Sequence, residues 1–172
     1  AELNCSANEL TNLSINGLSN LTKLICNSNK ITDLNINGLT NLVSLNCGNN
    51  DELTSVTLTN LTSLEEFSVI GNVSGNAVSS SKLTSLNLSG LPNLTKLNCS
   101  YGILTSLNLT GLSSLTELNC SSNFLTSLNL TNLPNLELLD CSRNHISSLD
   151  VTDLTNLLEL TCANAYIVDG QY

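Results

Sequence analysis

The sequence predicts a β-rich solenoid of about eight coils, and three observations lead to this fold class. The phrase LTKLNC at 94–99 returns as LTELNC at 115–120, a step of 21 residues. Leucine dominates the apolar residues, whereas aromatic residues make up only 3% of the chain. Cysteines recur in one phase of the repeat. One apolar environment used many times explains these features better than a varied globular interior.

Each coil is numbered so that its first leucine, such as Leu94, is position 1. Apolar residues then fall at positions 1, 4, 6, 11, 14, 16 and 19. One extra residue lengthens the third coil near Asp51–Glu52, and the fourth coil carries a loop insertion at 73–82. We expect residues 1–172 to form a single domain that is part of a longer protein. Its coils start near residues 1, 21, 42, 64, 94, 115, 136 and 157.

Positions 3 to 7 of each coil are predicted to form a β-strand. Side chains there alternate, with positions 4 and 6 inward and positions 3, 5 and 7 outward. Coils in register place these strands in a parallel sheet on the concave face. The phrase LTSLNL, about ten residues further on, shows the same alternation. Because Thr, Ser and Asn are poor helix formers, we expect short parallel strands on the convex side and little helix.

The pattern LxxLxCxxNxLxxLxL resembles the 21-residue class of bacterial leucine-rich repeats, also called IRREKO-type repeats. The resemblance covers essentially the whole chain. It implies a curved or nearly straight solenoid that acts as a binding scaffold, often in a secreted or surface protein. It implies no particular ligand.

Cysteine occupies position 6 in every coil except the fourth, where Val69 takes its place. On neighbouring parallel strands the Cβ atoms stay near ~4.8 Å apart, wider than the ~3.5–4.5 Å of a disulfide. The number of cysteines is odd, and no CxxC pair exists to suggest a zinc cage. We therefore predict a ladder of small buried hydrophobic side chains, made of Cys5, Cys26, Cys47, Cys99, Cys120, Cys141 and Cys162.

Asparagine fills position 9 in most coils, where the chain turns out of the strand. Its amide both donates and accepts hydrogen bonds, so we expect it to satisfy backbone groups of its own and adjoining coils. Gly102 interrupts the series and predicts a local defect. The expected asparagine ladder consists of Asn8, Asn29, Asn50, Asn72, Asn123 and Asn144.

The composition disfavours several classes of function. A net charge of −9 with five Lys and Arg residues argues against nucleic-acid binding. No run approaches the ~18 apolar residues of a membrane span, so no membrane insertion is expected. An enzyme is not expected either, because glycosidases need two carboxylates flanking a cleft and an open sheet excludes no water. No catalytic residue, metal or cofactor is assigned.

Candidate ligand-binding residues fall on two surfaces of the second half. Large side chains at positions 8 and 10 should form a stripe along one rim, and aromatic residues with Arg are favoured at binding hot spots. The alternatives are that the stripe covers the core edge or packs on another domain. Outward strand positions add an acidic group, for which a solvated surface is the alternative. The residues are Tyr101, Ile103, Phe124, Arg143, His145 and Tyr166 in the stripe, and Glu117, Asp140 and Glu159 in the acidic group.

We expect a non-catalytic binding scaffold that mediates protein–protein interaction in a bacterial protein located outside the cell or at its surface. The partner would be another protein, such as a host or cell-surface protein, or a glycan. Two alternatives stay open: a structural spacer or stalk segment of a longer repeat array, and a carbohydrate-binding adhesin module. Exposed end strands also predict end-to-end self-association.

Overall fold

The computed structural model describes residues 1–72 and 82–163, which form a parallel β-solenoid of about seven turns. Ten strands of three residues each occur in this part of the chain, and no helix does. The predicted fold class is confirmed. The strands are β1 (Glu2–Asn4), β2 (Lys23–Ile25), β3 (Asp33–Asn35), β4 (Ser44–Asn46), β5 (Ser55–Thr57), β6 (Glu66–Ser68), β7 (Lys96–Asn98), β8 (Glu117–Asn119), β9 (Leu138–Asp140) and β10 (Glu159–Thr161).

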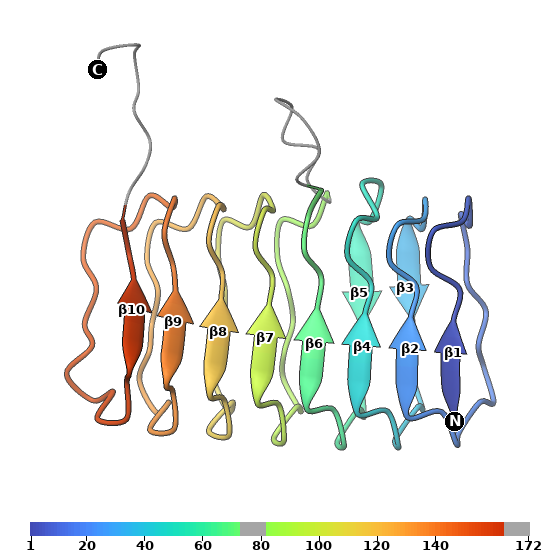
Figure 1. Ribbon diagram of the computed structural model, residues 1–172, viewed down its shortest axis with the longest axis horizontal. Coiled ribbons are helices and arrows are strands. Elements are labelled where there is room, and N and C mark those ends of the chain that lie inside the picture. The colour runs from blue at the N-terminus through green and yellow to red at the C-terminus, as the bar shows by residue number, and fades with distance from the viewer. Residues whose placement is uncertain (73–81, 164–172) are drawn as a thin grey trace, which may run out of the picture.

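Eight strands lie side by side in one parallel sheet, in the order β1-β2-β4-β6-β7-β8-β9-β10 (Figure 1). Glu66 pairs with Ser44 on one side, a step of 22 residues, and with Lys96 on the other, a step of 30 residues. The extra residue of the third coil and the insertion of the fourth are therefore absorbed without loss of register. We call the outward surface of this sheet the sheet face.

The strands cover positions 3 to 5 rather than the predicted 3 to 7, because side chains redirect the backbone beyond position 5. Asn98 Oδ1 accepts hydrogen bonds from the Ser100 amide (3.1 Å) and from Ser100 Oγ (2.7 Å). Position 8 then adopts a left-handed conformation, with φ of 57° at Tyr101. Backbone hydrogen bonds between coils nevertheless continue, for example from Tyr101 N to Ser121 O (3.0 Å).

The predicted strands on the opposite side of the coils are present at β3 and β5, which pair in parallel behind the main sheet (Figure 1). The Asp33 carboxylate accepts hydrogen bonds from Ser55 Oγ (2.7 Å) and Thr54 Oγ1 (3.2 Å) of the next coil. The bond from Ser55 is the main reason that the pKa of Asp33 is lowered. Later described coils carry serine at this position, as at Ser106 and Ser127, and form no strand there. The pairing of β3 with β5 thus occurs where a carboxylate bonds to the next coil.

The core is a continuous column of inward side chains from the successive coils. Leu24, Leu45 and Leu118 at position 4 are at most 2% exposed, as is Phe67 at the same position of the fourth coil. Burial of such a side chain contributes about 1.5–3 kcal/mol. Val69 lies two residues after Phe67 and takes the place of cysteine at 5% exposure. The solenoid interior therefore accepts either residue at position 6.

The predicted cysteine ladder is present, and all seven thiols are free. The expectation that every member is buried is wrong at the two ends of the sheet, where Cys5 is half-buried and Cys162 is exposed. Burial raises the pKa of the Cys26 and Cys99 thiols to about 12. These groups therefore stay protonated at neutral pH and behave as small apolar side chains. The buried members of the ladder are Cys26, Cys47, Cys99, Cys120 and Cys141.

Candidate binding surface

The asparagines of position 9 fix the turn between the sheet and the rim. Asn123 Nδ2 donates to the carbonyl oxygens of Cys99 (2.9 Å), Cys120 (3.1 Å) and Ser121 (3.2 Å), while its Oδ1 accepts from the Leu104 amide (3.0 Å). One side chain thereby joins two coils. Asn29 and Asn144 make equivalent sets of bonds, and so does Asn50.

The series differs at its start and in the middle. Asn8, at the exposed edge, donates to the carbonyl oxygens of Cys5 (3.1 Å) and Ser6 (3.0 Å) within its own coil. Asn72 donates to Asp51 Oδ2 of the previous coil (3.3 Å). Gly102 has no side-chain amide to make these bonds, and a cavity of about 10 Å³ lies beside it. The local defect expected at Gly102 is therefore a small void rather than a break in the stack.

The rim stripe contains one stacked pair of rings. The centroids of Phe124 and His145 lie 5.7 Å apart with 13° between the ring planes. Phe124 is 41% exposed, so one aromatic surface remains open to solvent. The amide of His145 bonds to Leu125 O (2.8 Å), which places the position-10 side chains of successive coils next to each other.

The other predicted stripe residues differ in how far they are exposed to solvent. Tyr101 and Ile103 are half-buried, and Arg143 is exposed. Tyr101 and Arg143 both occupy the left-handed position, with φ of 57° and 52°. Arg143 makes no ion pair within the described residues. Tyr166 and residues 73–81 of the predicted loop at 73–82 lie outside the described residues.

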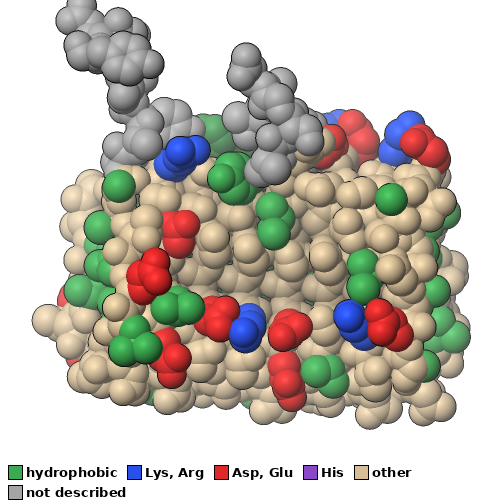
Figure 2. Space-filling model, viewed as in Figure 1, with side chains coloured by type: hydrophobic (Ala, Val, Ile, Leu, Met, Phe, Trp, Pro, Cys, Tyr) green, Lys and Arg blue, Asp and Glu red, His purple; other side chains and the backbone are tan. Residues whose placement is uncertain are grey.

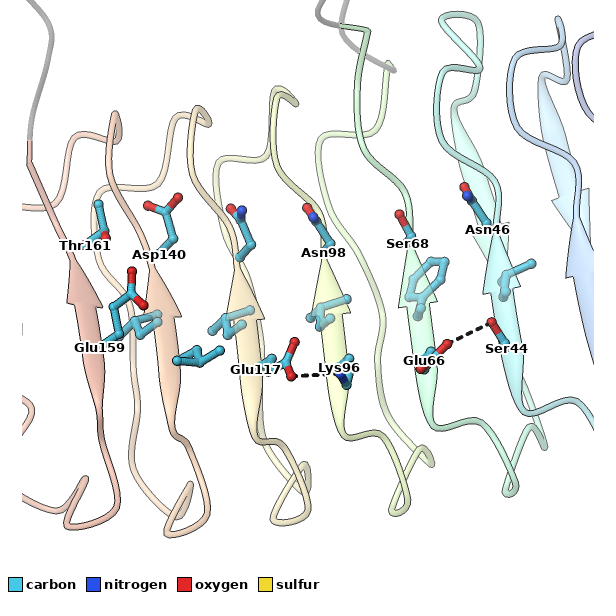
Figure 3. Close-up of a pocket in the computed structure, with 17 residues that line it drawn as sticks. Ser44, Asn46, Glu66, Ser68, Lys96, Asn98, Glu117, Asp140, Glu159 and Thr161 are labelled. Carbon is cyan, nitrogen blue, oxygen red and sulfur yellow. Dashed lines mark hydrogen bonds and ion pairs between the residues drawn. The ribbon is translucent and has the colours of Figure 1, made fainter.

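The sheet face carries a hollow of about 620 Å³ that extends across β4, β6, β7, β8, β9 and β10. Its lining consists of the outward side chains of these strands and the backbone between them. Figure 3 shows side chains of the labelled residues, from Ser44 and Asn46 to Glu159 and Thr161, projecting from the same face. A hollow of this size on an otherwise flat sheet can accept side chains from another molecule.

Charges on the sheet face are partly paired between neighbouring strands. Lys96 Nζ lies 2.8 Å from Glu117 Oε1, and this bond raises the pKa of Lys96. Ser44 Oγ donates to Glu66 Oε2 (3.2 Å) on the adjacent strand (Figure 3). Glu117 is therefore held by a lysine and is not a free anion. Asp140 is engaged differently, since its Oδ1 accepts from the amide (3.0 Å) and Oγ (2.6 Å) of Ser142.

The structure brings the three predicted acidic residues onto one part of the sheet face. Glu117, Asp140 and Glu159 all line the hollow. Glu159 pairs in register with Leu138. Within the described residues its carboxylate makes no hydrogen bond or ion pair. No group of three or more His, Cys, Asp or Glu side chains among residues 1–72 and 82–163 is placed to hold a metal ion.

Sequence reasoning missed two exposed leucines beside this acidic group. Leu138, at outward position 3, is 37% exposed, and Leu158, at position 2, is 79% exposed. Figure 2 shows acidic and hydrophobic side chains intermixed over β8, β9 and β10. The available signal was Leu138 itself, since no other coil has an apolar residue at position 3.

Comparison with solved structures finds bacterial leucine-rich repeat proteins. The functional domain of InlJ from Listeria monocytogenes, which includes a cysteine ladder, matches with a TM-score of 0.84 and 35% identity over 94% of this chain. An internalin, InlF, from L. monocytogenes matches with a TM-score of 0.45 and 24% identity, covering 84% of this chain and 55% of that one. A leucine-rich repeat protein of Leptospira interrogans matches with a TM-score of 0.41 and 23% identity, covering 90% and 58%.

The chain spans 34% of the InlJ chain that it matches. No model of a known protein family and no curated protein matches the sequence. Within the described residues no helix is both long and apolar enough to cross a membrane.

Proposed function

We propose that this chain, a leucine-rich repeat protein of the 21-residue class, is a non-catalytic scaffold that binds another protein. The contact surface is the sheet face together with the rim stripe of Tyr101, Ile103, Phe124, Arg143 and His145. The single observation that carries the proposal is the hollow of about 620 Å³ on the sheet face. The side chains at its outward positions differ from coil to coil, while the inward positions repeat.

The division between inward and outward positions supports this reading. Inward side chains such as Leu97 and Leu118 pack the core and are equivalent in each coil. At outward position 3 the side chain changes between lysine, glutamate, serine and leucine while the strands stay in register, whereas position-5 side chains such as Asn98 also bond to the following turn. Rigid strands and asparagine-fixed turns hold these groups in place, which lowers the entropic cost of forming an interface.

The proposed setting is a bacterial secreted or cell-surface protein. Its support is the likeness to the InlJ domain of L. monocytogenes, which shares the cysteine ladder. The proposed partner is a protein of a host cell or of another cell surface.

The experiment is capture of a partner from solubilised cell-surface extracts, followed by affinity measurement with purified components. Replacing Ser68 by Arg fills part of the hollow, because Ser68 is one of its lining residues. Replacing Tyr101, Phe124 and Tyr166 together by Ser removes the aromatic groups of the predicted stripe. We expect both changes to abolish capture and to leave the circular dichroism spectrum unchanged.

The matched control carries Ser85, Ser106 and Ser127 replaced by Ala on the opposite side of the coils, where all three are exposed. This variant should bind like the unmodified chain. Equal binding by all of these proteins would place the contact elsewhere and would contradict the proposal.

A second candidate, carbohydrate binding, is favoured by the Phe124–His145 stack. An open aromatic surface suits the apolar face of a sugar ring. A glycan-array signal that is lost on replacing Phe124 by Ser, but retained on replacing Ser68 by Arg, would support this candidate over protein binding.

A further inference from the structure

The sheet face differs in charge between its two ends. At positions 2, 3 and 5, β1 to β7 carry Lys23 and Lys96 against Glu2, Glu65 and Glu66, a net charge of −1. The same positions of β8 to β10 carry Glu117, Glu137, Asp140 and Glu159 with no basic residue, a net charge of −4. Figure 2 shows this accumulation of acidic side chains over β8, β9 and β10.

Partners within the chain are also unevenly distributed. In the first part, Glu2 pairs with Lys23 (3.5 Å) and Glu66 accepts a hydrogen bond from Ser44, and among the described residues only the carboxylate of Glu65 lacks such a partner at these positions. In the second part, the carboxylates of Glu137 and Glu159 have neither a hydrogen bond nor an ion pair within the described residues. Their charges remain available to an external cation.

Exposed apolar groups coincide with the unpaired carboxylates. Leu138 lies on β9 in register with Glu117 of β8 and Glu159 of β10. Leu158 immediately precedes β10, and its amide bonds to Glu137 O (2.8 Å). Both leucines are more than a third exposed. We call Glu117, Glu137, Leu138, Asp140, Leu158 and Glu159 the acidic–leucine patch.

We propose that the acidic–leucine patch binds a basic segment of the partner protein, in which lysine or arginine side chains alternate with apolar ones. This inference rests on the proposed function and names the chemistry of its partner. Because Lys96 pairs with Glu117, the patch keeps a net charge of −3 (four carboxylates and one lysine), which is complementary to a basic segment. The exposed leucines can contact apolar side chains or the aliphatic stems of lysine and arginine. The hollow that Leu138 and Glu159 line gives such side chains room.

The geometry suits an extended segment that crosses the strands. Adjacent strands lie about 4.8 Å apart, and Glu137 stands one residue before Glu159 in the register, so the two are separated by roughly 6 Å. An extended chain advances about 3.3 Å per residue, so side chains two residues apart lie on the same face at roughly 7 Å. Lysine or arginine side chains at alternate positions can therefore meet the two carboxylates, and their aliphatic stems can pass over Leu138.

The test uses the fluorescein-labelled peptide KLKSKLKS and fluorescence anisotropy at low and high salt. We expect the unmodified chain to bind it more weakly as salt rises. Glu137→Gln combined with Glu159→Gln should lower the affinity about fivefold, the effect of losing two exposed ion pairs. Leu138→Ser combined with Leu158→Ser should lower it by a similar factor.

Matched controls separate the patch from the overall negative charge. Glu65→Gln combined with Glu66→Gln changes the same charge at equivalent positions of the fourth coil, and Leu18→Ser removes a leucine that is 44% exposed elsewhere. Both controls should bind the peptide like the unmodified chain. No binding by the unmodified chain, or an equal loss in the two glutamine pairs, would overturn the inference.

The partner captured by the full chain distinguishes this inference from the proposed function. Loss of capture with Ser68→Arg, but full capture with Glu137→Gln and Glu159→Gln, would overturn the basic-segment proposal and leave the scaffold function standing. Full capture by both would contradict the scaffold surface itself. Loss of capture by both supports the two together.

Discussion

Two junctions between coils of this solenoid differ in the residue at position 9. At the first, Asn50 is 1% exposed, donates to the carbonyl oxygens of Cys26, Cys47 and Gly48, and accepts from the Ile31 amide. At the second, Gly102 provides none of these bonds, and a cavity of about 10 Å³ adjoins it. The sheet nevertheless continues in register from β6 to β8.

The comparison teaches that each coil is supported from both sides. Asn123 of the following coil donates to Cys99 O (2.9 Å), so one carbonyl near Gly102 is satisfied by the next amide. Backbone bonds such as Gly102 N to Ser122 O (3.0 Å) hold the turn as well. A stack whose stability adds up over neighbouring coils tolerates one missing member of the series.

The largest expected effect is the loss of a complete set of amide bonds. Asn50→Ala leaves buried backbone groups unsatisfied, at about 1–3 kcal/mol each, so the free energy of unfolding should fall by about 3–6 kcal/mol. Asn8→Ala is the matched control, since Asn8 is exposed and its amide donates only within its own coil. We expect about 1 kcal/mol there. Urea denaturation followed by circular dichroism measures both, and equal losses would contradict the role given to the buried amides.

The next effect concerns the thiol next to the Gly102 junction. Burial raises the pKa of Cys99 to about 12 from an ordinary value of 9.0. The unfolded chain therefore loses this proton first, so the thiol's contribution to stability is present below pH 9 and is lost as the pH rises toward 12. The slope is about 1.4 kcal/mol per pH unit for one such thiol.

The control for this pH dependence uses the residue that the fourth coil already carries. Cys99→Val puts valine where Val69 stands in the preceding coil, and it removes the ionisable group. The midpoint temperature of thermal unfolding should then fall less steeply between pH 8 and pH 11 than it does in the unmodified chain. Identical slopes would mean that the buried thiol does not titrate as described.

A smaller effect is expected at Gly102 itself. A Cβ atom added there would lie 2.7 Å from Asn123 Oδ1, which accepts a hydrogen bond from the Leu104 amide. Gly102→Ala should therefore lower the free energy of unfolding by about 1–3 kcal/mol.

A double-mutant cycle identifies the cause of that loss. With Asn123→Ala in the background the clashing oxygen is absent, so the further cost of Gly102→Ala should disappear. A cost that stays the same in both backgrounds would show that the glycine is required for another reason.

Much of the architecture could be predicted because the same type of residue recurs at each inward position in successive coils. The phase of Cys99 and Cys120, the register across the insertion and the void at Gly102 all follow from one frame. The second sheet was harder to place, since among residues 1–72 and 82–163 it forms only at β3 and β5, where Asp33 bonds to the next coil. A carboxylate that bonds to the next coil accompanies this pairing, and the average over all repeats conceals such a single-residue difference.

The candidate surface was less predictable than the core. The stacking of Phe124 on His145 follows from their shared position, but the left-handed conformation at Tyr101 and Arg143 has no residue type that announces it. Asp140 was predicted as a member of the acidic binding group, and its bonds to Ser142 were not foreseen. Because the residues at outward positions vary between coils, a prediction made for one coil cannot be checked against the others.

The in-register stack is tested most directly by the reactivity of its thiols. We expect iodoacetamide in native buffer to label Cys162, which is exposed, and more slowly the half-buried Cys5, as measured by mass spectrometry of tryptic peptides. The other five cysteines should react only after unfolding in urea, and the intact mass should show seven free thiols. Labelling of Cys47, Cys99 or Cys120 at the rate of Cys162, or a mass that reveals disulfide pairs, would contradict the ladder and the stacking on which the account depends.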